Sequence, residues 1–475
     1  MDARKRKKTS SSSWCAGFAH DDLWYTDAGE EHMRSKNLNL ICVVAVLVLA
    51  AMLPLPVMAV TDRSINAGTG GSWGNVSVWN GSNVPDSTGE RAVWSTARTP
   101  TLNGNFTIGS LKFNTGGAGI VGSGTNILTL AGDDNTGAVA VLCNMGGGTA
   151  AIACNIGLSR NSLQWAINSS GVCTVSGTIS SNGGTGLEKT SSGTLKLSGA
   201  NTYGGDTTIT AGTLQIDAAD VIPDGGTAGN VSITGTLDLN TFSETINGLS
   251  GAGTIDTVAG GSPVLTVGNN DGTGTFSGII KNSAGNLALT KTGAGTMILS
   301  GTNTYSGGTT VEDGSLLANN TGGSGAGSGT VSVNSGGTLG GTGSVTGLVS
   351  VVSGGHLVPG AGGSGTLTLS GGLTLADGAV LDIGLGTSSA LLRIPGGTFT
   401  GAGLQGVTIN VYDAGGLNET KYTLIDWSGA EIDRVDVTDF VVNLPDGNKS
   451  PFELSIENDT LVLRLFSYGT LMIVR

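Results

Sequence analysis

Apolar and polar residues alternate along most of the chain that follows residue 60. Stretches such as "TLKLSG", "VLTVGN", "TLTLSG" and "GVTINVYD" place an apolar side chain at every second position, between glycines and other turn residues. A period of two is the period of a β-strand, whose successive side chains point to opposite faces. Outside the N-terminal leader, no window of eleven or more residues has the i, i+3, i+4, i+7 spacing of an amphipathic helix. The pattern therefore predicts an all-β protein with many short strands.

The strand pattern also repeats at long range. Segment 187–216, "LEKTSSGTLKLSGANTYGGDTTITAGTLQI", is identical at sixteen of thirty positions to segment 289–318, "LTKTGAGTMILSGTNTYSGGTTVEDGSLLA", at a constant offset of 102 residues. Weaker similarity extends the two copies to 175–216 and 276–318. A period of roughly 100 residues is too long for one coil of a solenoid and suits a block of four or five coils.

Two architectures fit short strands separated by glycine turns at intervals of about 8 to 12 residues: a sandwich or barrel, and a solenoid of stacked coils. The long repeat favours the solenoid, because a coil that cannot bury its apolar face alone gains a core by stacking. The expected divisions of the chain are an N-terminal cap with the first coils at 60–121, the solenoid at 122–372 and a C-terminal β cap domain at 373–475.

Roles can be assigned inside the repeat. The side chains expected to face inward are Leu195, Leu197, Ile209, Leu214 and Ile216 in the first copy, with Met297 and Leu299 in the second. Lys196 and Ile298 are expected to face outward. Asn201 and Asn303 stand where a local Asx turn would satisfy backbone groups at a corner. The glycines expected to form corners at positive φ are Gly199, Gly204, Gly205, Gly301, Gly307 and Gly308.

A hydrophobic leader precedes the strand pattern. Residues 33–59 have a basic start, an apolar run at 38–53 and the small-residue ending "VMA", which together are typical of a secretory signal peptide. As a membrane anchor the run is shorter than the roughly 20 residues that a spanning helix needs, and two prolines interrupt it. We expect cleavage after Ala59, export, and no stable membrane span afterwards.

Residues 1–32 form an N-terminal extension that we do not expect to be structured. Its basic run at 4–8 could bind nucleic acid. The alternative, which we favour, is that translation starts at Met33.

Composition narrows the functional classes. The 475 residues include 83 glycines, only 12% are charged, and the net charge is −13. Removing residues 1–59 takes away 7 of 22 basic and 6 of 35 acidic residues and leaves a net charge of −14. An acidic surface does not favour phosphate backbones, so we expect no nucleic-acid partner. The many apolar residues and few charges also argue against a disordered chain.

Three cysteines follow the leader, Cys143, Cys154 and Cys173, each within an alternating apolar run. We expect them to be small hydrophobic residues of the core. In an oxidising compartment two of them could form a disulfide, and the sequence does not decide which two.

Large aromatic and acidic residues concentrate at opposite ends of the pattern. Trp73, Trp79 and Trp94 are expected to close the N-terminal end of the core, and a platform that stacks on sugars is the alternative. Thirteen acidic residues follow position 372, together with longer strands, which suits a C-terminal cap in contact with water.

Acidic residues offer two weak candidate sites. Asp133, Asp134 and Asn135 in "AGDDNTG" could bind a hard cation through their oxygen atoms, although a polar turn is the reading that we favour. Glu312 and Asp313 in "VEDG" also resemble turn residues, because the first copy of the repeat has threonine and alanine at these positions.

His356 is the sole histidine after the leader, and no cysteine or carboxylate lies within ten residues of it. A catalytic triad needs a base and an orienting acid in contact, so we expect His356 to be an exposed turn residue. "GNNDGTG", which begins at Gly268, is a weak match to Ca²⁺-binding turns because it has no tandem copy. We therefore assign no catalytic, cofactor-binding or metal-binding residue and expect no cofactor.

The two repeat segments together with "LTVGNNDGTGTFSGII", "GGTLGGTGSV" and "GGHLVPGAGGSGTLTLSGGLTL" resemble the autotransporter-associated β-strand repeat, also called the passenger-associated transport repeat. These five segments contain 108 of the 475 residues. It implies a large secreted or surface-exposed bacterial protein that folds as a right-handed parallel β-helix, capped here by β-segments at both ends. No catalytic residue belongs to that repeat.

The first hypothesis is accordingly a secreted or surface-exposed bacterial β-solenoid scaffold, similar to an autotransporter passenger, with an adhesion or matrix role and no catalytic site. Its partners would be cell-surface components or polysaccharide. About 100 residues follow the last repeat features, and we expect no membrane pore among them. The alternative is a β-helical polysaccharide lyase or glycoside hydrolase, for which at least three acidic or basic side chains should converge in one groove.

Overall fold

The computed structural model describes residues 60–65, 71–122, 124–132, 139–160, 163–360, 363–401, 406–417, 421–445 and 451–466. The predicted extension 1–32, the predicted signal peptide 33–59, and Asp133, Asp134 and Asn135 lie outside these residues. Four short 3₁₀ helices are described, η1 (Val76–Val78), η2 (Asn80–Ser82), η3 (Asn269–Asp271) and η4 (Val437–Asp439). No helix in this part of the chain has the length and apolar character needed to cross a membrane.

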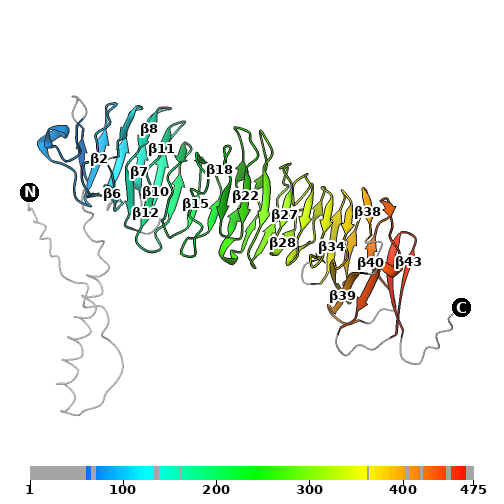
Figure 1. Cartoon of the computed structure of the whole chain (residues 1–475). Helices are drawn as coiled ribbons and strands as arrows, with labels where there is room; N and C mark the ends of the chain where they lie inside the picture. The colour runs from blue at the N-terminus through cyan, green and yellow to red at the C-terminus, as the bar shows by residue number, and fades with distance from the viewer. Residues whose placement is uncertain are drawn as a thin grey trace, which may run out of the picture. The chain divides into compact units, whose positions relative to one another are not determined.

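The strands of residues 60–466 form stacked coils that follow one another in chain order, from blue to red in Figure 1. Each full coil passes through three faces in turn, and neighbouring coils pair in parallel. Coil length varies from 18 residues, between the paired residues Val231 and Leu249, to 33 residues, between Thr408 and Val441. The predicted parallel β-helix is therefore confirmed.

Face 1 is one continuous sheet of 17 parallel strands along this stack. Its strands are β1 (Thr61–Ser64), β2 (Glu90–Trp94), β4 (Ser110–Phe113), β7 (Val139–Cys143), β10 (Leu163–Ile167), β13 (Leu187–Thr190), β15 (Thr207–Ile209), β17 (Val231–Ile233), β20 (Leu249–Gly251), β23 (Gly274–Phe276), β26 (Thr296–Leu299), β28 (Gly314–Ala318), β30 (Gly337–Gly341), β33 (His356–Pro359), β36 (Val380–Leu385), β39 (Val407–Asp413) and β42 (Phe440–Asn443).

Face 2 consists of two sheets in succession. The first holds β5 (Ala118–Ile120), β8 (Thr149–Ile152), β11 (Val172–Val175), β14 (Thr194–Leu197), β16 (Thr213–Ile216), β18 (Thr236–Asp238), β21 (Thr254–Asp256) and β24 (Ile279–Ile280). The second holds β31 (Ser344–Val345), β34 (Gly365–Leu369), β37 (Ala390–Arg393), β40 (Lys421–Asp426), β44 (Thr460–Leu465) and β43 (Phe452–Glu457), of which the last two pair in an antiparallel manner.

Face 3 is also made of two sheets. The first holds β3 (Phe106–Ile108), β6 (Ile127–Leu130), β9 (Asn155–Leu158) and β12 (Ile179–Ser181). The second holds β19 (Glu244–Ile246), β22 (Val264–Val267), β25 (Ala288–Lys291), β27 (Thr309–Val311), β29 (Val331–Val333), β32 (Val349–Val351), β35 (Leu373–Leu375), β38 (Thr398–Thr400) and β41 (Glu431–Asp433).

The core lies between the three faces and is filled by alternate residues of each strand. The seven inward residues predicted from the repeat are at most 2% exposed, whereas Lys196 and Ile298 are only half-buried. The three cysteines are buried and free, as expected of small core residues. Burial raises the pKa of the Cys154 thiol to about 12, which keeps it protonated.

Aromatic side chains close the N-terminal end of this core. Trp73, Trp79 and Trp94 are fully buried, and the Trp73 ring centroid lies 4.9 Å from that of Trp79 and 5.9 Å from that of Trp94. Because none of the three exposes a ring face, they form a cap and not a sugar-stacking platform. At the other end, parallel coils continue past residue 372 to β42, and antiparallel pairing is confined to β40, β44 and β43 among the described strands. The domain boundaries drawn from the sequence stay predictions.

The expectation for the corner glycines was wrong at five of six positions. Only Gly308 has a positive φ, of 90°; Gly199, Gly204, Gly205, Gly301 and Gly307 do not. These five are required by close contact between coils, since a Cβ atom at Gly301 would lie 1.8 Å from the carbonyl oxygen of Gly278. The left-handed conformation is used instead at Gly212 and Gly314, which are equivalent in the two copies.

Candidate functional site

The two copies of the repeat lie on different faces of the stack. In the first copy β13 is on face 1 and β14 on face 2, whereas the equivalent β25 and β26 are on faces 3 and 1. The offset of 102 residues therefore equals four coils and two further faces. Equivalent outward positions of the two copies consequently point in different directions.

Each copy interrupts one face with an asparagine. Asn201 Oδ1 accepts the N–H of Ile179 at 2.8 Å, and its Nδ2 donates to the carbonyl of Val221 at 2.7 Å. This side chain thus bridges the coils below and above at the break between the two sheets of face 3. The expected local Asx turn is replaced by a bond between coils.

Asn303 forms the same bridge at the break in face 2. Its Oδ1 accepts the N–H of Ile280 at 2.8 Å, and its Nδ2 donates to the carbonyl of Gly325 at 2.7 Å. Both asparagines are buried, at 8% and 2% exposure. Buried backbone groups need hydrogen-bond partners. Where a face has no strand, the buried asparagine amide pairs with two backbone groups of the neighbouring coils in place of the strand.

A buried lysine binds backbone carbonyls at the corners that follow β13 and β15. Lys189 Nζ donates to the carbonyls of Thr190, Ser191 and Ala211 at 2.8, 2.8 and 3.1 Å. The side chain has no exposed surface, and its desolvation lowers the pKa of the ammonium to about 8. Three carbonyl oxygens are the full set of acceptors that an ammonium group can use.

Lys291 repeats this arrangement in the second copy. Its Nζ donates to the carbonyls of Thr292, Gly293 and Asp313 at 2.8, 2.7 and 3.1 Å. Burial lowers the pKa of Lys291, while the nearby Asp313 and Asp271 carboxylates oppose that shift.

A tyrosine completes the shared network. The Tyr203 hydroxyl lies 2.7 Å from Thr207 Oγ1, and the Tyr305 hydroxyl lies 2.6 Å from Thr309 Oγ1. Both rings are buried, and burial raises the pKa of both phenols. The lysine, asparagine, tyrosine and threonine that the two copies share are therefore core residues.

The copies differ in the group that lies above the asparagine bridge. In the first copy the N–H groups of Val221 and Ile222 donate to the carboxylate of Glu244 at 3.1 and 2.9 Å. Glu244 is fully buried, and this burial raises its pKa to about 8. In the second copy Gly325 donates instead to the backbone carbonyl of Ser344 at 2.8 Å.

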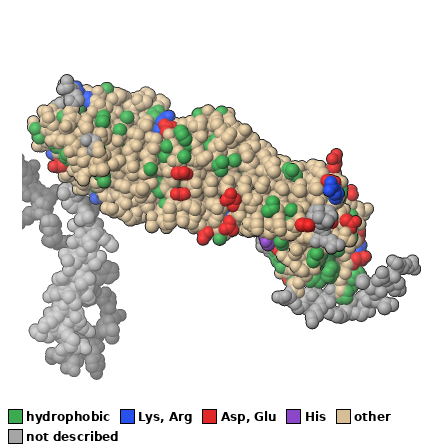
Figure 2. Space-filling view, viewed as in Figure 1, with side chains coloured by type: hydrophobic (Ala, Val, Ile, Leu, Met, Phe, Trp, Pro, Cys, Tyr) green, Lys and Arg blue, Asp and Glu red, His purple; other side chains and the backbone are tan. Residues whose placement is uncertain are grey.

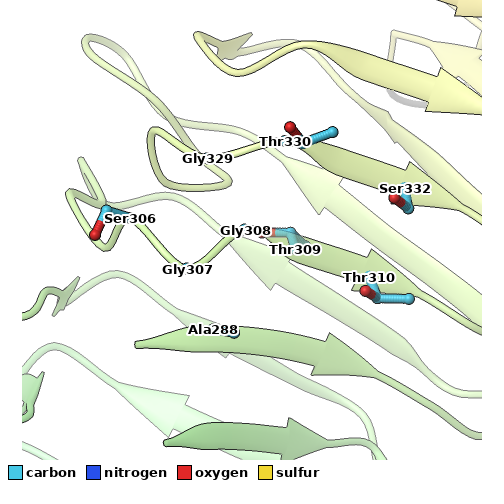
Figure 3. Close-up of a pocket in the computed structure, with 9 residues that line it drawn as sticks. All are labelled: Ala288, Ser306, Gly307, Gly308, Thr309, Thr310, Gly329, Thr330 and Ser332. Carbon is cyan, nitrogen blue, oxygen red and sulfur yellow. The ribbon is translucent and has the colours of Figure 1, made fainter. Parts of the chain in front are cut away.

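The copies also differ at the corner that leads into their second coil. In the first copy Asp206 Oδ1 accepts the N–H of Asn230 at 2.8 Å. In the second copy Gly308 occupies the equivalent position without a side chain, and a hollow of about 430 Å³ opens there. Figure 3 shows it between neighbouring coils, and its lining residues are Ala288, Ser306, Gly307, Gly308, Thr309, Thr310, Gly329, Thr330 and Ser332.

This lining determines what the hollow can bind. It offers hydroxyl and peptide groups, and none of its nine lining residues is ionisable in the neutral pH range. Such a site can form hydrogen bonds with a neutral polar group, but these residues offer no general acid or base. Among the described residues, no three His, Cys, Asp or Glu side chains are placed to hold a metal ion.

The predicted turn residues Glu312 and Asp313 lie in the bend between β27 and β28, as expected. The stretch "GNNDGTG" contains η3, and the side chains of η3 bind other groups of the protein. Asn269 and Asn270 donate to the carbonyl of Asp224, and Asp271 Oδ1 accepts the N–H of Ala294.

The expectation for His356 was wrong. This residue begins strand β33, and its Nδ1 lies 2.6 Å from Asp382 Oδ2 in β36. The acid is 26 residues away in sequence but lies on the next coil of the same face. Only the coil length, which the sequence pattern leaves open, could have shown this proximity.

Comparison with known proteins agrees with the fold. The family model of the passenger-associated transport repeat matches residues 187–216 and 289–318, the two segments that carry the networks described above. The adhesin BmaC autotransporter of Brucella suis biovar 1 (strain 1330) is 38% identical to the chain over 138 residues. This alignment covers 28% of the chain and 4% of the adhesin's length. The chain therefore contains two segments that match the passenger-associated transport repeat.

Proposed function

We propose that the chain is an exported, surface-exposed β-helical scaffold of the autotransporter-passenger type, which acts in adhesion and has no catalytic role. The observation that carries this proposal is the location of the repeat's shared residues. Lys189, Asn201 and Tyr203 and their counterparts all lie in the interior, where they join coil to coil. The repeat thus builds the stack and leaves the outer surface free to vary.

The outer surface supports contact with other molecules. In Figure 2 the visible face carries few charged side chains, and most of these are acidic. Backbone, glycine and uncharged polar side chains make up most of the rest. An elongated stack with such a surface offers many hydrogen-bonding groups along one continuous sheet, and the similarity to an adhesin supports this use.

Surface display in a Gram-negative host tests the proposal. Intact cells that express the chain should bind an antibody against residues 60–466, and external protease should remove that signal. N-terminal sequencing of the product should give a start after Ala59. A variant that lacks residues 33–59 is the matched control and should stay inside the cell.

Adhesion is tested in the same cells. Cells that display the chain should attach to a glycan-coated or host-cell-coated surface more than cells that express the control variant. A product that begins at Met1 and stays in the cytoplasm would contradict export, and equal attachment of the two cell types would contradict adhesion.

A further inference from the structure

Near the C-terminal end of face 1, polar side chains form a line across four successive strands. His356 of β33 binds Asp382 Oδ2 of β36, Asp382 Oδ1 accepts Asn410 Nδ2 of β39 at 2.8 Å, and Asn410 Oδ1 accepts Asn443 Nδ2 of β42 at 3.0 Å. Asp382, Asn410 and Asn443 occupy paired register positions on their strands. We call His356, Asp382, Asn410 and Asn443 the polar strip.

The polar strip keeps much of its hydrogen-bonding capacity for other molecules. The side chain of His356 is 37% exposed and that of Asp382 is 24% exposed, and Asn443 is exposed. Each asparagine amide uses one N–H of its two in the line, and the imidazole uses one of its two nitrogens. The remaining donors and acceptors lie on an open sheet face.

Apolar groups flank this line. Tyr412 lies two residues after Asn410 on the same face of β39, and it is near Asp382, since that carboxylate adds to the effect of burial in raising the pKa of the Tyr412 phenol. Val441, two residues before Asn443, is 51% exposed. The surface therefore presents planar polar groups beside an aromatic ring and an exposed aliphatic side chain.

The geometry points to one class of ligand. Successive coils are ~4.8 Å apart, which is similar to the length of one sugar ring in an extended glycan. Planar amide and carboxylate groups suit paired sugar hydroxyls, and aromatic and aliphatic groups suit the C–H face of the ring. Because the polar strip contains the carboxylate of Asp382 and the chain carries a net charge of −13, an anionic polymer is disfavoured.

We propose that the polar strip, with Tyr412 beside it, binds an extended neutral glycan that lies across the strands of face 1. This inference rests on the proposed function, because it names the class of partner that an adhesin of this shape would hold. The glycan would follow the stacking direction and form hydrogen bonds with successive coils.

Native gel electrophoresis in the presence of soluble polysaccharide tests this proposal on the purified full chain. The neutral probes are dextran, xyloglucan and galactomannan, and the anionic probes are alginate and hyaluronate. At least one neutral probe should retard the wild-type chain, and the anionic probes should not. The double variant N410A/N443A should weaken retardation roughly tenfold, as expected for the loss of two hydrogen-bonding groups.

A matched control is present on the same face. Gln164 Nε2 of β10 donates to Glu188 Oε2 of β13 at 3.1 Å, so Q164A removes a similar link between strands far from the polar strip. Q164A should be retarded as strongly as wild type. The single variant N443A, at the exposed end of the line, should show a smaller loss, and unchanged circular dichroism should accompany each variant.

The proposal would be overturned if no neutral probe retards the wild-type chain, if the anionic probes retard it more, or if N410A/N443A behaves as wild type. Its failure is distinguishable from failure of the proposed function. Displayed wild-type chain that attaches cells, with equal attachment by N410A/N443A, would remove the polar strip and leave the adhesion proposal standing.

Discussion

The two copies of the repeat share their buried lysine, asparagine and tyrosine networks and differ in the groups next to them. Both place a buried lysine on three carbonyls, a buried asparagine between two coils and a tyrosine against a threonine, with bond lengths that match within 0.1 Å. They differ where Glu244 is replaced by a backbone carbonyl and where Asp206 is replaced by Gly308. The networks of the repeat are thus independent of the face on which they stand.

This agreement has a physical cause. A coil with a strand on only two faces leaves backbone groups unpaired on the third, and the asparagine satisfies them wherever that third face lies. The shared lysine, asparagine and tyrosine side chains bind equivalent groups in both copies, so their networks form on either set of faces. Outward side chains meet solvent or ligands and are free to diverge.

The largest expected effect is the loss of a tyrosine ring from the interior. Tyr203→Ala and Tyr305→Ala should each lower the free energy of unfolding by about 3–5 kcal/mol, because each leaves a large cavity in the core. Urea unfolding followed by circular dichroism measures the loss. If the two variants differed by more than about 2 kcal/mol, the equivalence of the copies would be broken.

A local measurement sharpens this test. Amide hydrogen exchange should increase around the break in face 3 for Tyr203→Ala and around the break in face 2 for Tyr305→Ala, because a solenoid residue contacts mainly adjacent coils. The conservative control Tyr203→Phe loses only the bond to Thr207 and should cost about 1 kcal/mol.

The asparagine bridges come next in size. Asn201→Ala leaves the N–H of Ile179 and the carbonyl of Val221 without their hydrogen-bond partner, and a buried unpaired group costs about 1–3 kcal/mol. We expect a loss of roughly 2–4 kcal/mol there and the same loss for Asn303→Ala. Asn168→Ala is the control, because the Asn168 side chain binds the side chain of Asn144 at the surface. This substitution should change the free energy of unfolding by about 0.5 kcal/mol or less. Equal losses in all three variants would refute the special role of the bridges.

Glu244 should make the first copy sensitive to pH in a range where the second is not. A carboxyl group of the unfolded chain ionises near its ordinary pKa of 4.5, whereas burial raises the pKa of folded Glu244 to about 8. The folded state therefore binds more protons between these values, and stability should fall as pH rises from about 4.5 to 8. We expect this fall across the range in the wild-type chain and expect Glu244→Gln to remove it.

Urea midpoints at several pH values provide the measurement. Hydrogen exchange should place the change at the Val221 and Ile222 amides and leave the Gly325 amide unaffected, since Gly325 donates to a backbone carbonyl. A pH profile that is the same in wild type and Glu244→Gln would show that this carboxyl group does not titrate in the range.

The sequence revealed those features that depend on near neighbours. Alternation places Leu195 and Leu197 inward because strand geometry fixes where each second side chain points. The offset of 102 residues between the copies showed a block of four or five coils, and the observed block is four coils and two faces. The same alternation predicted that the three cysteines lie in the core.

Features that depend on coil length were not visible in the sequence. Corners vary so much that coils run from 18 to 33 residues, so no fixed period shows that His356 meets Asp382 or that Asn201 lies between Ile179 and Val221. The close contacts at Gly199 and Gly301 likewise come from the neighbouring coil. A glycine at a corner can meet either of two requirements, a positive φ or close contact with the neighbouring coil. The sequence pattern alone does not distinguish between them.

The smallest expected effect concerns the hollow that only the second copy has. Gly308→Asp would give this corner the residue of the first copy, with a carboxylate able to accept the N–H of Thr330 as Asp206 accepts that of Asn230. The φ of 90° at Gly308 opposes the change, because a left-handed conformation costs about 1–2 kcal/mol for a residue with a Cβ atom. The new bond offsets about 1 kcal/mol of this, so we expect a net loss of about 1 kcal/mol or less in urea unfolding.

Asp206→Gly should cost a similar amount in the first copy. A loss above about 3 kcal/mol for Gly308→Asp would mean that its backbone, and not its missing side chain, is what distinguishes the two corners.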